Sequence, residues 1–404
     1  METGKASRSR LIPAVGFPVN NPDPMQPPPL RRCWVEVDLA ALERNLGNIR
    51  AALPARIQYV AVVKADAYGH GIHPVVTRLM QSGAGSFAVA NIEEARRIRE
   101  IGSGWPILVL SAILPEEDRS IVDYHLIPAV SSGQEVERFE SLARTRNQKM
   151  PVHLKIDTGM GRLGVWYTEA AGLYRRLSRS PHLELQGVYT HFSSADSDPV
   201  FTAEQRRRFL RTLHALPGFD PAGKLIHADN SAGLESFQPD SPFNAVRVGL
   251  LQFGILPYPD SLLSRVLVEP VLSFHTRVGL VKSIPAGTGV SYGRTHFTSR
   301  RTRVAVLTAG YGDGIPVAIS NRGSVLIRGL SCPILGRVTM DQTIVDASRL
   351  DSVRVGDTAT FIGRQNEAEI RAADFAKQAD TIPYEVFTSV TKRVTRIYKS
   401  SRDL

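Results

Sequence analysis

The feature that most constrains the fold is a strand-then-helix rhythm that repeats through the first part of the chain. Short runs of β-branched and apolar residues alternate with longer stretches whose apolar residues recur at helical spacing. The expected strands are residues 57–63, 86–90, 105–111, 126–130, 151–156, 183–189, 224–228 and 244–249. The clearest helical stretches between them are residues 91–102, 133–146 and 203–216. About eight strands separated by helices predict a parallel sheet, because parallel neighbours need a crossover connection.

Such a sheet can close into a barrel or stay open as a doubly wound fold. The open fold that binds dinucleotides carries a GxGxxG turn after its first strand, and no such turn follows residues 57–63. We therefore predict an α/β fold class, with a (β/α)8 TIM-type barrel. In such a barrel the carboxyl ends of the strands converge on one mouth, so polar residues at strand ends indicate chemistry.

After about residue 265 the sequence changes to short alternating strands with Gly-rich turns, which predicts a mostly β C-terminal domain. The expected strands lie within residues 273–287, 301–310, 323–329, 333–340 and 356–363. A short helix at 372–379 and a final helix near 384–394 are expected to close the chain.

The barrel domain is expected at residues 31–265 and the mostly β domain at residues 266–404. A short strand near residues 34–37 opens the first of these and can pair with the C-terminal domain. Asp38 follows it as a plausible N-cap of the next helix.

Composition limits the class of protein. Residues 1–30 are rich in Pro, Ser and Asn without an uninterrupted apolar segment, which predicts a disordered leader and neither a signal peptide nor a membrane span. Two cysteines, Cys33 and Cys332, exclude a disulfide framework and suit the cytoplasm. The net charge of +10 favours anionic ligands. Without a zinc-finger spacing or an aromatic RNP-type stretch, nucleic-acid binding is not expected.

Polar side chains gather at the predicted strand ends. Lys64 follows the first strand; the others are Lys155 and Asp157 on the fifth, His191 after the sixth, Asn230 and Ser231 after the seventh, and Arg247 and Gly249 on the eighth. This set is too polar to serve only as barrel filling. Taken alone, however, a lysine such as Lys64 is more often solvated or salt-bridged than bonded to a cofactor, and Arg247 could be part of a salt bridge inside the barrel.

The last two strands suggest a phosphate site. Loops after strands seven and eight of such barrels often bind phosphate through backbone N–H groups. The segments "DNSAG" (229–233) and "VGLL" (248–251) supply the small residues that close approach requires, although two tight turns would explain them as well. A phosphate cradle across the mouth from Lys64 describes a site for pyridoxal phosphate (PLP).

Nine sequence blocks in order resemble those of bacterial alanine racemases, from about residue 33 to residue 390. They are "WVEVDLAALERN", "AVVKADAYGHG", "HLKIDTGMGRLG", "HADNSA", "VRVGL", "VSYG", "AGYGDG", "GRVTMDQ" and "IPYEV". The resemblance implies an isomerase that interconverts L-alanine and D-alanine with PLP, supplies D-alanine for peptidoglycan and works as a homodimer.

The resemblance also implies a role for each matching residue. Lys64 would bind PLP covalently and act as one base, with Tyr292 as the second base, supplied by the other subunit. The remaining cofactor residues would be Tyr68, Ser231, Gly249, Leu250 and Tyr384 at the phosphate, Asn230 in support of them, and His191 and Arg247 at the pyridine ring. Arg162 and Met340 would contact the substrate carboxylate, Tyr311 would line the entrance, and Asp341 would support them. Lys155 would carry a carbamate.

Chemistry favours the same residue types. Racemisation removes a proton from one face and returns one to the other, which two bases perform better than one. A tyrosine base needs its phenolate favoured, and Arg162 and His191 could do this. A permanent cation such as Arg247 would disfavour protonation of the pyridine nitrogen. On their own, Tyr292 could be a hairpin tyrosine and Lys155 an unmodified lysine.

Rival functions remain open from sequence. Thr339 stands where many relatives have Cys, which leaves the preference for alanine or serine as substrate undecided. A broad-specificity racemase of the same fold would typically be exported. A non-catalytic PLP-binding protein would lack the β domain, and a basic-amino-acid decarboxylase would carry a second-domain cysteine motif that "LSCPI" does not match.

Overall fold

The computed structural model describes residues 31–236, 242–256 and 266–400. The predicted leader, residues 1–30, lies outside these ranges. Residues 257–265, next to the predicted domain boundary, lie outside them as well. The division at 265/266 stays a prediction.

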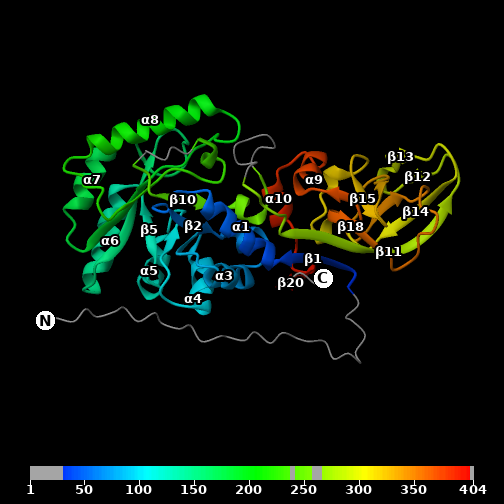
Figure 1. Ribbon diagram of the computed structural model, residues 1–404, viewed down its shortest axis with the longest axis horizontal. Coiled ribbons are helices and arrows are strands. Elements are labelled where there is room, and N and C mark those ends of the chain that lie inside the picture. Colours follow the sequence, from blue (N-terminus) through cyan, green and yellow to red (C-terminus); the bar gives the residue numbers. More distant parts are fainter. Residues whose placement is uncertain (1–30, 237–241, 257–265, 401–404) are drawn as a thin grey trace. The chain divides into compact units, whose positions relative to one another are not determined.

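The strands of the first part close into a barrel, as predicted from the sequence (Figure 1). They follow the order β5-β4-β3-β2-β10-β9-β8-β6, and a pairing of β5 with β6 closes the ring. All of these pairs are parallel. The strands are β2 (Gln58–Val62), β3 (Ser86–Val89), β4 (Ile107–Val109), β5 (Ile127–Val130), β6 (Met150–Asp157), β8 (Leu183–Tyr189), β9 (Leu225–His227) and β10 (Ala245–Val248), with a short β7 (Val165–Trp166) beside β6.

The barrel strands read as nearly continuous apolar runs because both of their faces are covered. Every residue of β3, β4 and β5 is buried. Helices lie outside the strands (Figure 1). They are α1 (Leu39–Ala51), α3 (Ile72–Gln81), α4 (Ile92–Ile101), α5 (Asp118–Asp123), α6 (Gly133–Thr145), α7 (Ala170–Ser178) and α8 (Pro199–Ala215). The short α2 (Lys64–Tyr68) and the 3-10 turns η1 (Pro115–Glu117), η2 (Gly233–Ser236) and η3 (Leu250–Phe253) lie in the connections.

The C-terminal part is mostly strand, again as predicted. Its main sheet has the order β16-β15-β18-β11-β1-β20, with β14 and β17 continuing from β11, β19 beside β18, and a separate β12-β13 hairpin. The elements are β1 (Cys33–Asp38), β11 (Leu272–Ile284), β12 (Gly289–Val290), β13 (His296–Phe297), β14 (Thr302–Leu307), β15 (Ser324–Ile327), β16 (Leu330–Pro333), β17 (Thr343–Asp346), β18 (Thr358–Gln365), β19 (Ala368–Ile370), β20 (Thr395–Lys399), α9 (Ala372–Gln378) and α10 (Pro383–Thr388), with 3-10 turns η5 (Tyr292–Arg294), η6 (Tyr311–Asp313) and η7 (Val317–Ile319).

Two local predictions were wrong. Residues 333–340 do not form one strand: β16 ends at Pro333 and a loop follows, in which Gly336 has a φ of 72°. A Cβ on Gly336 would lie 2.5 Å from the Val290 carbonyl oxygen, so the loop passes close to the β12-β13 hairpin. The final helix ends at Thr388, and the chain closes instead on β20.

Strand β1 precedes the barrel in the sequence but belongs to the C-terminal sheet. It pairs antiparallel with β11 and parallel with β20, although barrel helix α1 follows it directly. Asp38 lies at this junction: its backbone N–H donates to the Val271 carbonyl at 2.8 Å, and its carboxylate accepts the Ala41 N–H at 2.8 Å. The predicted N-cap is therefore confirmed.

Within the ranges that the structure describes, no helix combines the length and the apolar character that a bilayer crossing requires.

We predict that Asp38→Ala lowers the free energy of unfolding by about 1 kcal/mol, because the Ala41 N–H loses its acceptor at the start of α1. Asp38→Asn keeps a side-chain oxygen and should lose only a few tenths of that value. Urea unfolding of the three proteins at one pH measures the difference. An equal loss in both variants would contradict a capping role.

Candidate active site

A cavity of about 540 Å³ opens at the carboxyl ends of the barrel strands. Its size falls in the range of small-molecule sites. The residues that line it are Val62, Lys64, Tyr68, Leu110, Ser111, Lys155, Met160, Arg162, Leu163, Tyr189, His191, Ser193, Asn230, Ser231, Arg247, Gly249, Leu250, Ile382 and Tyr384. The cavity thus gathers the predicted site residues of the barrel, together with Tyr384 from α10.

The charge of the cavity is one-sided. Lys64, Lys155, Arg162 and Arg247 line it, whereas none of the described residues that line it carries a carboxylate. Positive charge in a concave, partly desolvated site attracts anions. The cavity is therefore suited to a ligand that carries phosphate and carboxylate groups.

Lys64 is presented by an unusual backbone segment. The four residues that follow it, Ala65, Asp66, Ala67 and Tyr68, have φ values of 53° to 55°, which makes α2 a left-handed turn. This conformation costs a residue with a Cβ roughly 1–2 kcal/mol. The turn reverses the chain so that Lys64 and Tyr68, at its two ends, both line the cavity.

The environment of Lys64 favours its neutral amine. Burial lowers the pKa of Lys64, the positive charge of Arg162 lowers it further, and the carboxylate of Glu94 partly opposes both. A neutral amine is the nucleophilic form of lysine, so this position suits covalent chemistry.

Lys155 shows the same effect more strongly. Burial, followed by the charges of Arg247 and Arg162, lowers the pKa of Lys155 to about 7. Within the described part of the chain, its Nζ donates one long hydrogen bond, of 3.5 Å to the Leu110 carbonyl, and lies 5.4 Å from the centroid of the Tyr189 ring. A reactive neutral amine is therefore well populated near neutral pH.

Hydroxyl and backbone N–H groups meet at one end of the cavity. The Ser231 hydroxyl accepts the N–H of Gly249 at 3.0 Å and that of Leu251 at 3.4 Å. A Cβ on Gly249 would lie 2.4 Å from the Tyr68 hydroxyl, so this close approach requires glycine. Asn230 supports the loop by accepting the Gly233 N–H at 2.7 Å. This arrangement fits a phosphate group.

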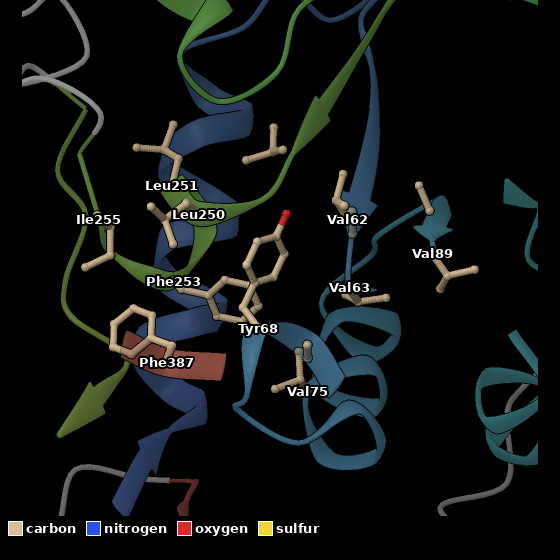
Figure 2. Close-up of a cluster of buried hydrophobic side chains, with 14 of the residues drawn as sticks. Val62, Val63, Tyr68, Val75, Val89, Leu250, Leu251, Phe253, Ile255 and Phe387 are labelled. Atoms are coloured by element: carbon tan, nitrogen blue, oxygen red, sulfur yellow. The ribbon is translucent and has the colours of Figure 1, made fainter. Parts of the chain in front are cut away.

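Tyr68 is held firmly at this end. Figure 2 shows its ring beside Phe253 in a cluster of buried side chains, and the two ring centroids are 5.4 Å apart. The Tyr384 ring lies 5.8 Å away on the cavity side. Burial raises the pKa of Tyr68, so its hydroxyl stays protonated and can donate a hydrogen bond.

Arg247 is almost fully buried, and the acceptors that the described residues offer it are neutral. It donates to the carbonyls of Thr190 and Ala228, each at 2.9 Å. It also contacts Nδ1 of His227 at 2.6 Å and Nδ1 of His191 at 3.1 Å. A guanidinium has no atom that can accept a hydrogen bond, so both histidines must accept through Nδ1.

The histidines around Arg247 stay uncharged. Burial and the charge of Arg247 lower the pKa values of His191 and His227 well below the ordinary value, and that of His153 to about 3. Burial also lowers the pKa of Arg247 to about 10, which leaves it protonated at neutral pH. With Nδ1 of His227 occupied, its Nε2 donates to Nδ1 of His153 at 3.1 Å. These contacts together fix the tautomers of His191, His227 and His153.

Three predicted residues lie outside this cavity. Tyr292, Met340 and Tyr311 are not among its described lining residues, and their exposed fractions are 71%, 52% and 44%. Their loops are joined: the Ser291 hydroxyl donates to the Arg337 carbonyl, and the Tyr311 N–H donates to Thr339 at 2.9 Å. They form a second group of candidate site residues on the β domain, which we call the exposed group.

Two acidic residues near the predicted site organise loops. Asp157 accepts the backbone N–H groups of Gly159, Met160 and Arg162, which orders the loop that carries Arg162. Asp341 accepts from Arg393 at 2.8 Å, in line with a supporting role.

Sequence analysis missed several buried groups beside the cavity. His153 shares the alternation of Lys155 on β6, and His227 ends β9, so strand parity was a usable signal for both. Arg206 from α8 pairs with Asp229 at 2.6 Å directly before Asn230. No sequence signal connected that pair, because its members belong to different elements.

We predict that Lys155 makes stability depend on pH. Its folded-state pKa of about 7 is depressed, so the unfolded chain binds one more proton between that pH and about pH 10. The free energy of unfolding should therefore rise across this window, and Lys155→Met should remove a rise on the order of 1–4 kcal/mol. Urea unfolding in CO2-free buffer measures it, with Lys282→Met as the control at an exposed lysine. Identical slopes for wild type and Lys155→Met would contradict the depressed pKa.

Comparisons with known proteins agree with this geometry. Two family models match the chain, "Alanine racemase, N-terminal domain" at residues 37–257 and "Alanine racemase, C-terminal domain" at residues 271–398. An alanine racemase of Halothermothrix orenii is 39% identical over 371 residues, which cover 92% of this chain and 97% of that protein.

Solved structures give the same result. An alanine racemase from Bacillus anthracis with bound L-Ala-P has a TM-score of 0.84 and 36% identity, covering 93% of this chain and 97% of that one. An alanine racemase from Bartonella henselae with covalently bound pyridoxal phosphate has a TM-score of 0.83 and 28% identity, covering 92% of this chain and 100% of that one. With both domain models matched in order along most of its length, this chain belongs to the alanine racemase family.

Proposed function

We propose that this chain interconverts L-alanine and D-alanine with PLP as cofactor and so supplies D-alanine for peptidoglycan synthesis. The observation that carries the proposal is a lysine with a lowered pKa in a cavity that is lined by three further basic side chains and bordered by hydroxyl and backbone N–H groups. The activity of the relatives supports alanine as the substrate. Both cysteines are free and buried, which supports a cytoplasmic location.

The residues around the cavity fit PLP. Lys64 would supply the amine that bonds the cofactor covalently. The phosphate would be held by Tyr68, Ser231, Gly249, Leu250 and Tyr384, with Asn230 in support, and the ring by His191 and Arg247. When bound, PLP supplies an electron-withdrawing ring that stabilises negative charge on the substrate α-carbon.

Arg247 would set the protonation of the ring nitrogen. Its guanidinium can donate hydrogen bonds but cannot accept one, and carbonyls and neutral histidines hold it in place. A fixed cation would keep that nitrogen unprotonated, which limits how far the ring withdraws electrons. We infer that this limit suppresses side reactions at the cofactor.

Two bases would move the α-proton. Lys64 would serve one face of the α-carbon and Tyr292 the other, each taking or returning a proton according to the direction of the reaction. Arg162 and His191 would favour the phenolate form of Tyr292. Arg162 and Met340 would bind the substrate carboxylate, and Tyr311 would line the entrance.

Lys155 would act through a carbamate. Its neutral amine attacks CO2, an N–C bond forms as one C–O π bond opens, and the nitrogen loses one proton, so a neutral amine becomes an anion; counted from the ammonium form, two protons are lost. This anion would hold Arg162 and reduce the excess of positive charge among the cavity residues. The lowered pKa of Lys155 supports the reaction because only the neutral amine is nucleophilic.

A homodimer would complete the site. The exposed group is outside the cavity of its own chain, yet the two-base mechanism needs Tyr292 within reach of the same carbon as Lys64. A two-fold arrangement would place the exposed group of each chain over the cavity of its partner and create two equivalent sites.

The function is tested on products and on the anchor residue together. Purified protein with PLP should convert L-alanine to D-alanine in chiral chromatography, with L-serine assayed separately. Borohydride reduction and peptide mapping should place the pyridoxyl group on Lys64, and Lys64→Ala should lose both label and product. An amine with CO2 as products, or label on another lysine, would overturn the proposal.

Subunit sharing is tested by mixing Lys64→Ala with Tyr292→Phe chains, each nearly inactive alone. If Tyr292 acts in trans, a mixed dimer has one site that lacks both bases and one intact site. Random exchange should then restore about a quarter of wild-type activity. Unmixed samples taken through the same exchange protocol are the control. Demonstrated exchange without recovery would show that both bases come from one chain.

A further inference from the structure

The left-handed turn after Lys64 is contacted at its start by a carboxylate from the next β/α unit. Oε1 of Glu94, on α4, accepts the Ala65 backbone N–H at 2.6 Å. Oε2 of the same residue accepts the Ala90 N–H at 2.8 Å. One side chain thus ties the first residue of the turn to the end of strand β3.

Glu94 is not needed as the cap of its own helix. Asn91 is the N-cap of α4 and accepts the Glu94 N–H at 2.9 Å. Glu93, one position earlier on the same helix, faces solvent and pairs with Arg96. The contact of Glu94 with Ala65 therefore serves the turn, and its neighbour provides a matched comparison.

The other end of the turn has its own attachments. Nδ1 of the buried His70 lies 3.0 Å from the Ala67 carbonyl and 2.9 Å from the Tyr68 carbonyl, so it donates to both. Arg396 of β20 donates to the Gly69 carbonyl at 2.9 Å. Among the described residues, Glu94 alone provides a side-chain acceptor for the Ala65 N–H, next to Lys64.

We propose that Glu94 is a positioning residue for Lys64, which keeps the left-handed turn closed and so holds the Lys64 amine at the cavity. The inference rests on the proposed role of Lys64 as the cofactor anchor. Each residue of the turn carries a Cβ, so the turn opposes its own backbone preference and needs an outside contact to persist.

Glu94 has a second effect that must be separated from the first. Its negative charge raises the pKa of Lys64 against the larger effects of burial and of Arg162. Removing the carboxylate therefore changes both the backbone and the charge. Glycine distinguishes these effects, because it adopts positive φ without steric cost and alters no charge.

The test compares Glu94→Ala, Ala65→Gly and the double variant as full-length proteins. PLP binding is followed by absorbance titration and by borohydride labelling of Lys64, and the melting temperature of each protein is recorded. Glu94→Ala should weaken PLP binding by about tenfold or more, the loss expected for a hydrogen bond to a charged group. Ala65→Gly alone should stay within about twofold of wild type.

The double variant decides the mechanism. It should recover most of the lost affinity, because glycine removes the strain that Glu94 opposes. The midpoint pH of covalent labelling should nevertheless stay shifted to lower pH in both variants that lack the carboxylate, because glycine restores no charge. Glu93→Ala should behave like wild type in every measurement.

Several results would overturn the inference. They are normal PLP binding by Glu94→Ala, a double variant no better than Glu94→Ala, or an equal loss in Glu93→Ala. If Glu94→Ala alone fails to fold, recovery of a soluble, labelled double variant still supports it, and failure of the double variant as well refutes it. A wild-type protein without label on Lys64 would instead refute the proposed function, so the two failures are distinguishable.

Discussion

The site depends on how one buried guanidinium, that of Arg247, is held. Among the described residues its hydrogen-bond partners are carbonyls and histidines, and none is a carboxylate. Arg247 is 2% exposed and donates to two carbonyls and two neutral histidines. Burying a charge is expensive unless every donor is satisfied. Burial, and after it the charge of Arg247, lower the pKa values of Lys155, His191 and His227, so the two histidines stay neutral and the pKa of Lys155 is about 7.

The same site depends on backbone shape at two points. The left-handed turn places Lys64 and Tyr68 at the cavity, and Gly249 allows its backbone to approach the Tyr68 hydroxyl. Tyr384 reaches the cavity from α10, so the C-terminal part contributes to it within one chain. Side-chain chemistry and backbone geometry are thus fixed by separate parts of the chain.

The sequence predicted the barrel because each strand and helix carries its own periodicity, and it predicted the cavity residues at strand ends because those ends meet at one mouth. Tyr68, Leu250 and Tyr384 were predicted only from the family resemblance. It missed β20 because "TRIYK" is short and polar and finds its partner at the opposite end of the chain. The loop after Pro333 was taken for a strand because its apolar residues gave no hint of the positive φ at Gly336. Glu94 was missed because its helix looks like any amphipathic helix, and only the fold brings it to Ala65.

The pairing of β1 with β11 and β20 determines when during synthesis the C-terminal sheet can form. A ribosome releases β1 among the first elements, β11 only after the whole barrel, and β20 last. Until then β1 has unpaired edges, which are prone to join other chains. The barrel can begin to fold during translation, but the pairing of β1 with β20 must wait until Thr395–Lys399 have been made. A message truncated just before Thr395 would yield a chain in which β1 still lacks a neighbour on one side.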